Sequence, residues 1–473
     1  MTTRPAKDLL VTHLPPAAFQ GVVPAIIATS DADGTPNATY LSQVFLIDDR
    51  HVALSCQFFN KTKRNVLQNP HACVFLHDPL TFETFRLYVR YLRAETTGPL
   101  FDRMSARIEA IASHTGMSGI FKLLSADVYE VTSIEAIEDF LEPAPAEPPT
   151  DEPIRDRNEL ASLQLVSVRA SRATDLEGLL SGVLQALHEG FGFEHSMVLL
   201  LDETSERLTA IASHGYGDAG VGAEVRVGEG LIGTVARERC VLRVTGVGQE
   251  LRYGRAIRAT VHRQAGPRAL RPEIPLPGLV DAQSQMAMPL IVGDRLIGVI
   301  AVESRSLVAF DAWHEAYLDI VGNQVAVAID NMMDRDKEAE AEVEPATTSD
   351  QAPVVSSTSP SMEEPTGRVL RFRFYEGDDC VFAGDDYLIR NIPGRILWRL
   401  LRAYESSGRT DFSNRELRLD PTLGLPSIRD NLESRLVLLR KRLAQKCPDV
   451  KLVSTGRGLF RLELGCKIVL EDG

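Results

Sequence analysis

The stretch Val225-Arg-Val-Gly-Glu-Gly-Leu-Ile-Gly-Thr-Val-Ala236 decides how the centre of this 473-residue chain folds. An apolar run leads into closely spaced glycines and then into residues that open a helix, so we expect a strand, a turn and a helix. Gly228-Glu-Gly-Leu-Ile-Gly233 also has the Gly-x-Gly-x-x-Gly spacing of dinucleotide sites, as does Gly215-Tyr-Gly-Asp-Ala-Gly220. Glu229 stands where a pyrophosphate would approach, and the segment 215–220 precedes no clear helix. We therefore interpret both segments as turns.

The residues on either side of this stretch alternate between helical and strand patterns. An amphipathic helix is expected from Leu176 to Phe191, and apolar strands are expected around 196–202 and 296–304. A helix from Asp311 to Met333 closes the module. This order resembles a GAF domain, and the resemblance implies an α/β/α sandwich over residues 156–336. It also implies a pocket for a small molecule between the sheet and a lid loop.

The lid loop expected at 246–282 is unusually basic, with Arg252, Arg255, Arg258, His262, Arg263, Arg268 and Arg271. An anionic ligand or an acidic patch on a partner domain would explain this charge, and a solvated insertion is the alternative. GAF domains also dimerise through their terminal helices, which implies a homodimer here. The apolar residues available for this on the last helix are Ile320, Val321, Val325, Val327, Ala328 and Ile329.

Two segments poor in large apolar residues divide the chain. Residues 141–155 are rich in proline and acidic side chains, which predicts an extended linker. Residues 337–367 are acidic and then rich in Ser, Thr and Pro, which predicts a disordered linker. We therefore expect a multidomain α+β protein with modules at 1–140, 156–336 and 368–473.

The first module begins with short apolar runs separated by turn signals, which predicts a meandering antiparallel sheet that closes toward a barrel. The stretch Phe58-Phe-Asn-Lys-Thr-Lys-Arg-Asn-Val-Leu-Gln-Asn-Pro-His-Ala-Cys-Val-Phe-Leu76 then combines a polar turn, a short helix and a returning strand. It resembles the FMN-binding split barrel of the pyridoxamine 5'-phosphate oxidase-like family over residues 18–135. In that family basic and hydroxyl side chains near this turn hold the flavin phosphate, which needs several charge-assisted donors.

The resemblance implies FMN as a cofactor, and it assigns the cofactor to Ser42, Gln43, Ser55, Gln57, Lys61, Thr62 and Lys63. Another flavin-like ligand, or none, is the alternative, because barrels of this type exchange or lose their cofactor. In that case Lys61 and Lys63 belong to a solvated turn. The module also lacks the C-terminal substrate-binding segment of the oxidase and carries an inserted amphipathic stretch at 100–112. His114 follows it and could contact a ligand, donate a proton, ligate haem iron or cap a helix end.

The third module holds the basic residues of an otherwise acidic chain. Residues 368–473 contain 20 Lys and Arg and 15 Asp and Glu, whereas the whole chain has a net charge of -14. Leucines at 432, 436, 439 and 443 form a stripe on a helix expected from Ser427 onward, so its basic residues should face away from the core. Strands, three helices and a hairpin at 453–464 resemble the winged helix-turn-helix effector domain of response regulators.

In such a domain the third helix enters the major groove and the wing contacts the backbone or the minor groove. The resemblance implies DNA as a partner of residues 368–473, and it assigns DNA contacts to Arg429, Asn431, Arg435, Lys441, Arg442 and Arg457. Asp430 and Glu433 on the same helix would repel phosphates, so a winged helix that binds protein is the alternative. A receiver domain does not precede the module, so phosphorylation of that kind is not the expected input.

The sequence lacks the motifs of disulfide frameworks, metal sites and catalytic nucleophiles. The six cysteines show no Cys-x-x-Cys spacing, and the ten histidines show no metal-ligand spacing, so we expect neither a disulfide framework nor a metal site. A Gly-x-Ser-x-Gly elbow is also missing, and we assign no catalytic residue. The lack of a long apolar run and of a signal peptide predicts a cytoplasmic protein without a membrane span.

We consider three hypotheses for the function. The first is a cytoplasmic ligand- or redox-sensing regulator, in which the first two modules sense a signal and the winged helix acts on transcription. The second is a flavin-dependent oxidoreductase that its GAF and winged-helix modules regulate or localise. The third is a scaffold without a ligand. We favour a sensor over an enzyme, because tethered input modules ahead of a basic module have no evident purpose in a simple oxidase.

Overall fold

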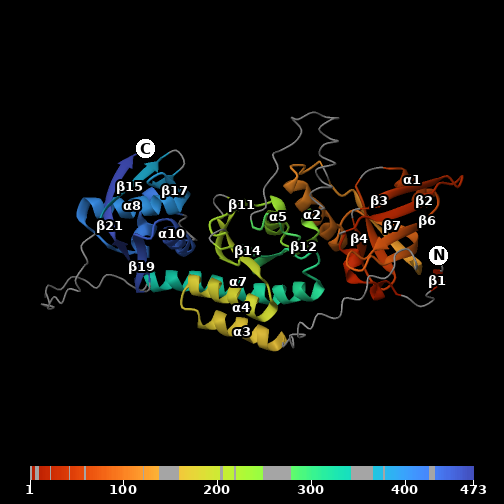
Figure 1. Cartoon of the computed structure of the whole chain (residues 1–473), viewed down its shortest axis with the longest axis horizontal. Coiled ribbons are helices and arrows are strands. Elements are labelled where there is room, and N and C mark those ends of the chain that lie inside the picture. The colour runs from red at the N-terminus through yellow and green to blue at the C-terminus, as the bar shows by residue number, and fades with distance from the viewer. Residues whose placement is uncertain are drawn as a thin grey trace.

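The computed structural model describes residues 3–5, 10–21, 23–41, 43–57, 60–120, 122–137, 159–202, 206–217, 220–248, 278–341, 366–376, 379–425, 432–456 and 458–472. These residues form three bodies in a row (Figure 1). The N-terminal body lies at one end, the C-terminal body at the other, and the central body between them.

The N-terminal body is a curled antiparallel sheet in the order β3-β2-β6-β7-β8-β5-β4, and β1 pairs with β8. Alternate residues of β2 are buried, so Ala25, Ile27 and Thr29 face the interior of the half-barrel. The elements are β1 Thr3–Pro5, β2 Ala25–Ser30, β3 Pro36–Leu41, β4 Val44–Leu46, β5 His51–Cys56, α1 Lys61–Gln68, β6 His71–His77, β7 Thr84–Glu95, α2 Pro99–His114 and β8 Ser125–Ile137.

Helix α2 has two apolar faces rather than the one expected from the sequence. Met104, Ile108 and Ala112, spaced four residues apart, pack with Ala53 and Ala126 of the barrel. The next faces of the helix bring Ala106, Ala110 and Ile111 into a different cluster, which belongs to the central body. The inserted helix therefore joins the cores of two bodies.

The central body has three layers around a sheet in the order β11-β10-β9-β14-β13-β12. Val198 and Leu200 of β9 face one cluster together with helices α3, α4 and α7, and Met197 and Leu199 face the other with α5 and α2. In Figure 1, α3, α4 and α7 lie together below the sheet. The elements are α3 Glu159–Arg172, α4 Leu176–Phe191, β9 His195–Asp202, β10 Arg207–His214, β11 Glu224–Arg226, α5 Gly230–Glu238, β12 Leu242–Thr245, β13 Ser284–Val292, β14 Arg295–Ser304 and α7 Ala312–Ala341.

The C-terminal body contains two small sheets, β17-β16-β15-β21 and β18-β20-β19, around three helices. The leucine stripe of α10 is buried, as its spacing predicts, whereas the expected first turn of that helix at 426–431 lies outside the described residues. The elements are β15 Thr366–Tyr375, β16 Cys380–Ala383, β17 Asp386–Ile389, α8 Asn391–Ser407, β18 Asp411–Ser413, α9 Asn414–Leu419, α10 Leu432–Lys446, β19 Val450–Gly456, β20 Leu459–Leu464 and β21 Cys466–Asp472.

Candidate functional site

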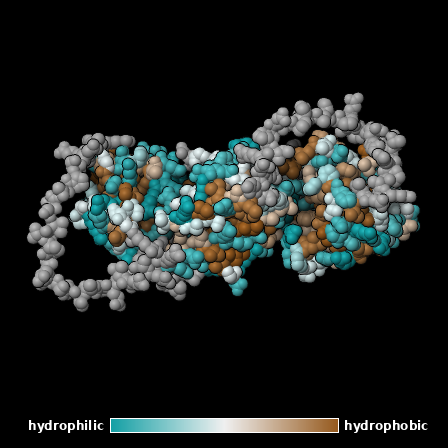
Figure 2. Space-filling model, turned by 90° about the horizontal axis from the view of Figure 1, so that it is seen from below, coloured by the Kyte–Doolittle hydropathy of each residue, from teal (hydrophilic) through white to brown (hydrophobic). Residues whose placement is uncertain are grey.

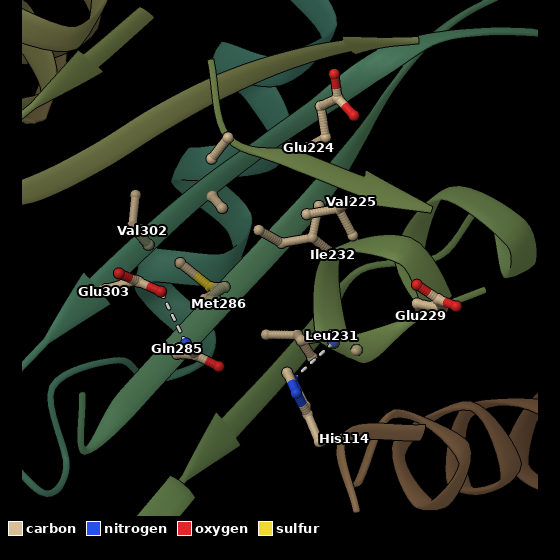
Figure 3. A pocket seen from close by; sticks show the side chains of 13 residues that line it. His114, Glu224, Val225, Glu229, Leu231, Ile232, Gln285, Met286, Val302 and Glu303 are labelled. Carbon is tan, nitrogen blue, oxygen red and sulfur yellow. Dashed lines mark hydrogen bonds between the residues drawn. The ribbon is translucent and has the colours of Figure 1, made fainter. Parts of the chain in front are cut away.

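A cavity of about 180 Å³ lies in the central body, between the sheet and helix α5. Its apolar wall comes from β11, α5, β13 and β14, and its polar wall includes one residue of the N-terminal body, His114 (Figure 3). In Figure 3, His114 and Glu224 lie at opposite ends of the cavity. The apolar residues are Ala223, Val225, Leu231, Ile232, Met286, Ala301 and Val302, and the polar ones are His114, Glu224, Glu229, Gln285 and Glu303.

The N-terminus of α5 is capped by side chains from another body. Glu229 occupies the N-cap position of α5 but its side chain makes no capping hydrogen bond. Instead Ser113 Oγ accepts a hydrogen bond from the Gly230 N–H at 2.8 Å, and His114 Nε2 accepts one from the Leu231 N–H at 3.2 Å. These contacts satisfy two of the donors that a helix leaves unpaired at its start.

The capping geometry settles what His114 does in this arrangement. Its ring lies at the C-terminus of its own helix, as expected for a helix cap, but it hydrogen-bonds the N-terminus of α5. Because Nε2 accepts a hydrogen bond, that nitrogen carries no proton. A Cβ at Gly230, where φ is +64°, would lie 2.8 Å from the His114 ring, which explains one glycine of the Gly228–Gly233 segment. That segment forms the turn into α5, as the sequence indicated.

A buried carboxylate lines the side of the cavity opposite α5. Glu303 has 2% of its surface exposed and accepts hydrogen bonds from the Leu279 N–H at 2.7 Å, from the Tyr216 hydroxyl at 2.8 Å and from Gln285 Nε2 at 2.7 Å. Burial raises the pKa of Glu303, and the three hydrogen bonds lower it in part. All three donors are neutral groups.

A second carboxylate links the cavity to the C-terminal body. Glu224 Oε2 accepts hydrogen bonds from Arg207 at 3.1 Å and from Arg390 at 2.7 Å, and Glu224 Oε1 accepts one from Asn391 Nδ2 at 3.2 Å. The charge of Glu224 raises the pKa of Arg390. Arg390 and Asn391 stand at the start of α8, so a wall of the cavity is tied to the neighbouring body.

Helix α10, which carries three of the six expected DNA contacts, packs against the central body. Arg435 is 6% exposed and pairs with Asp202 at 3.4 Å. Lys441 Nζ donates to the Ile211 carbonyl at 3.3 Å, and burial lowers the pKa of Lys441. The guanidinium of Arg442 lies over Gly222. The structure thus brings these three residues together on the surface of the central body, whereas Arg429, Asn431 and Arg457 lie outside the described residues.

A second cavity, of about 140 Å³, lies in the half-barrel and contains Ser55, Gln57, Thr62 and Lys63 of the expected cofactor residues. Lys63 Nζ is already paired there, at 2.6 Å from Asp127 and 3.1 Å from the Tyr91 hydroxyl. Thr62 Oγ1 accepts a hydrogen bond from Asn37 at 3.0 Å. In contrast, Gln57 Nε2 is buried without a hydrogen-bond partner.

The remaining expected cofactor residues are not among those that line this cavity. Gln43 Nε2 donates to the Phe19 carbonyl at 3.0 Å, and Lys61 Nζ donates to the Pro36 carbonyl at 3.5 Å. Ser42 lies outside the described residues, as do the seven basic residues of the expected lid loop. Among the described residues, four of the seven expected cofactor residues therefore line this cavity.

Sequence reasoning missed three residues that line the central cavity, Glu224, Gln285 and Glu303. It also missed Ser113, which caps α5. Glu303 did leave a signal, because it is a lone charge at the end of the apolar run 296–302. Ser113 and Glu224 left none, since their partners are far away in the chain. Within the described ranges, no helix is long and apolar enough to cross a membrane, and no cluster of three potential metal ligands occurs.

Comparison with family models identifies two of the three bodies. Residues 17–134 match the model described as pyridoxamine 5'-phosphate oxidase, and residues 173–330 match the model described as GAF domain. The N-terminal body is therefore a pyridoxamine-phosphate-oxidase-like domain and the central body is a GAF domain, as both resemblances predicted. The central cavity is a cavity of that GAF domain. No curated protein matches the chain.

Solved structures are similar to parts of the chain. The GAF domain of an Acinetobacter phosphoenolpyruvate-protein phosphotransferase is 16% identical, covering 39% of this chain and 98% of that one, with a TM-score of 0.30. A free methionine-R-sulfoxide reductase from Neisseria meningitidis, in complex with its substrate, is 20% identical over 37% and 89%, with a TM-score of 0.29. An FMN-binding protein from Syntrophomonas wolfei subsp. wolfei is 17% identical over 27% and 86%, with a TM-score of 0.22.

Proposed function

We propose that the chain is a ligand-responsive regulator in which the GAF cavity controls whether the C-terminal body can bind DNA. The observation that carries this proposal is the position of Glu224, which lines the cavity and also holds Arg390 and Asn391 of the C-terminal body. A ligand that changes the contacts of Glu224 would change the stability of that attachment. Ligand binding in the cavity and release of the C-terminal body are then thermodynamically coupled.

The output of the regulator is proposed to be a winged helix that binds DNA. The order β15 to β17, α8, α9, α10 and the β19–β20 hairpin supports this, together with the basic excess of residues 368–473. In the present arrangement Arg435 and Lys441 contact the GAF domain instead of solvent. We therefore assign this arrangement to a state in which the DNA-contacting helix is covered.

The test compares DNA binding by three full-length proteins. Glu224→Gln combined with Asp202→Asn removes the acidic partners of Arg390 and Arg435, whereas Glu238→Gln changes a carboxylate at the end of α5 that pairs with Arg237. Binding to genomic DNA fragments at about 50 mM salt is measured by titration, because phosphate contacts are strongest at low salt. The double variant is expected to bind about tenfold more tightly than the unchanged protein and the control.

Equal affinity of all three proteins would contradict the covered state. If the double variant showed greater amide exchange in α10 but still bound no DNA, the C-terminal body would be assigned to a protein partner instead. Amide exchange in α10 reports on the attachment of the C-terminal body, and the titration reports on DNA binding, so the two parts of the proposal are tested separately.

A second candidate function is flavin binding by the N-terminal domain, which is the basis of the oxidoreductase alternative. The family match of residues 17–134 and the unpartnered Gln57 Nε2 in the half-barrel cavity favour it. Asp127 neutralises Lys63, so a flavin phosphate would have to displace that carboxylate or bind through Lys61. The absorption spectrum of the purified protein tests this, because a bound flavin absorbs in the visible range. A colourless protein that gains no spectrum with added FMN would rule it out.

We also propose that the chain forms a homodimer through α7. Ile320 and Val327 lie seven residues apart on this helix and are 45% and 49% exposed, whereas Val321, Val325 and Ile329 are buried in the domain core. Figure 2 views this side of the molecule and shows hydrophobic side chains gathered over the central body. Ile320→Glu with Val327→Glu is expected to convert a dimer to a monomer in analytical ultracentrifugation. A wild-type monomer at high concentration would contradict the proposal.

A further inference from the structure

The described walls of the GAF cavity carry negative and neutral groups and no positive ones. Glu224, Glu229 and Glu303 line it, and neither Lys nor Arg is among the described lining residues. His114 adds no positive charge, because its Nε2 accepts the Leu231 N–H. Glu224 is paired with Arg207 and Arg390, but an anionic ligand would still face the carboxylates of Glu229 and Glu303, for which no ion pair occurs among the described residues. In a site of low dielectric this is unfavourable. This argues against the anionic ligand that the basic lid loop suggested.

Glu303 is the most deeply buried of the three carboxylates that line the cavity. Its three hydrogen-bond donors are a backbone N–H, a phenol and a carboxamide, and no ion pair to it occurs among the described residues. A carboxylate can accept about four hydrogen bonds, so one acceptor position remains. Burial of a carboxylate that lacks a cationic partner is costly, and such groups concentrate at functional sites.

The neighbour of Glu303 adds a second acceptor. Gln285 donates its Nε2 hydrogen to Glu303, which leaves the side-chain carbonyl oxygen of Gln285 to accept from a ligand. Figure 3 shows these two side chains joined by their hydrogen bond on one side of the cavity, with Met286 beside them and Ile232 on the side of α5. The polar end of the cavity therefore offers acceptors, and the rest of the wall offers apolar contacts.

The size of the cavity limits the apolar part of the ligand. An apolar protein cavity of about 150 Å³ holds one benzene molecule. The GAF cavity, at about 180 Å³, has room for such a ring or a branched alkyl chain together with one small polar group. Larger ligands, such as nucleotides, would not fit into this volume.

We propose that the GAF cavity binds a small primary amine or amidine with an apolar body about the size of a benzene ring, and that Glu303 pairs with its cationic group. The proposal rests on the proposed function only in taking this cavity as the sensor site. The ligand's N–H groups would donate to the Glu303 carboxylate and the side-chain carbonyl of Gln285, and its apolar body would lie against Ile232 and Met286.

The test uses the full-length protein and three probes of equal shape, benzylamine, benzyl alcohol and benzoate. Calorimetric titration is expected to show benzylamine binding at least about tenfold more tightly than benzyl alcohol, and benzoate most weakly. Glu303→Gln is expected to remove the preference for the amine and to leave benzyl alcohol binding within about twofold. Glu238→Gln, which lies outside the cavity, serves as the matched control and should leave the order unchanged.

Folding of the variant is checked independently. The carboxamide introduced by Glu303→Gln would keep an acceptor for the Tyr216 hydroxyl and the Leu279 N–H, and it would remove a buried charge. We therefore expect thermal unfolding of this variant at or above the temperature of the unchanged protein. Stronger binding of benzoate, an amine preference that survives in Glu303→Gln, or no binding of any probe would each overturn the proposal.

The outcome is separable from that of the proposed function. Amine binding that depends on Glu303, without any effect of the amine on DNA affinity, would support the ligand class and contradict the regulatory coupling. DNA binding that responds to Glu224→Gln with Asp202→Asn, without amine selectivity, would contradict the ligand class alone.

Discussion

The GAF domain meets its two neighbours through interfaces of different character. The first, which we call the capped interface, joins α2 to α5 through Ala106, Ala110 and Ile111 and through the caps at Ser113 and His114. It also contains one long ion pair, Arg237 with Glu109 at 3.9 Å. Its apolar contacts and its hydrogen bonds to backbone groups depend little on salt. These are the properties of a permanent domain interface.

The second, which we call the ion-paired interface, joins α10 and the start of α8 to the GAF domain through Arg390 with Glu224, Arg435 with Asp202, and Lys441 with a carbonyl. Apolar contacts also run from the GAF core into the C-terminal core. The opposite charges, however, make its strength sensitive to salt and to substitution of single residues. The difference supports the proposal that the N-terminal and GAF domains act as one unit and that the C-terminal body is released from them.

The largest effect is expected when a charge is placed in the capped interface. Ala110 of α2 is fully buried against the GAF domain, so Ala110→Glu would bury a carboxylate without a partner. We expect it to lower the free energy of unfolding by about 3 kcal/mol, measured by urea denaturation. Arg103→Ala, on the exposed face of the same helix, is the control and should change it by less than about 0.5 kcal/mol. Equal effects of the two changes would show that α2 does not pack against α5.

A smaller effect is expected from removing one cap. Ser113→Ala leaves the Gly230 N–H without its acceptor, which should cost about 1 kcal/mol of stability. Ser105→Ala on the same helix controls for the change in helix propensity. The measurement is the urea midpoint at constant m-value, together with amide exchange of Gly230. Unchanged exchange at Gly230 would mean that another group caps α5.

Salt is expected to separate the two interfaces without any substitution. At about 0.5 M salt the Debye length falls to about 4 Å, which screens partly exposed ion pairs. We therefore expect amide exchange in Leu432–Lys446 to increase severalfold between low and high salt, and exchange in Gly230–Glu238 to change by less than about twofold. Equal responses of α10 and α5 would remove the distinction between the interfaces.

The smallest expected effect is a stabilisation of the docked state of α10. Burial lowers the pKa of Lys441, so the docked state disfavours its charged form. This cost is fully present below the lowered pKa and is lost as the pH rises through it toward the ordinary pKa of lysine. Lys441→Met removes the buried ammonium and is expected to slow exchange in α10 by about twofold and to weaken its response to alkaline pH. Arg440→Met, at the adjacent half-buried position of α10, is the comparison variant. Faster exchange in Lys441→Met would show that the lysine stabilises docking.

Much of the fold followed from periodicity, because burial repeats along one element at a time. The GAF strands around 196–202 and 296–304, the leucine stripe of α10 and the turn at Gly228–Gly233 were predicted from neighbouring residues. The two faces of α2 were not, since an amphipathic stretch predicts one buried face and does not show that a second body covers another face. Lys63 lines the half-barrel cavity, as the sequence predicted. Its pairing with Asp127 was not predicted, because Asp127 lies 64 positions further along the chain.

The sequence by itself determined that this chain contains a pyridoxamine-phosphate-oxidase-like domain, a GAF domain and a basic C-terminal module, because those identities reside in local order and spacing. Only the tertiary structure decided what surrounds the GAF cavity. Ser113 and His114 each cap a backbone N–H that lies 117 positions further along the chain, and Arg390 reaches Glu224 across 166 positions. Contacts between such distant residues depend on how whole domains pack, and no local pattern encodes that packing.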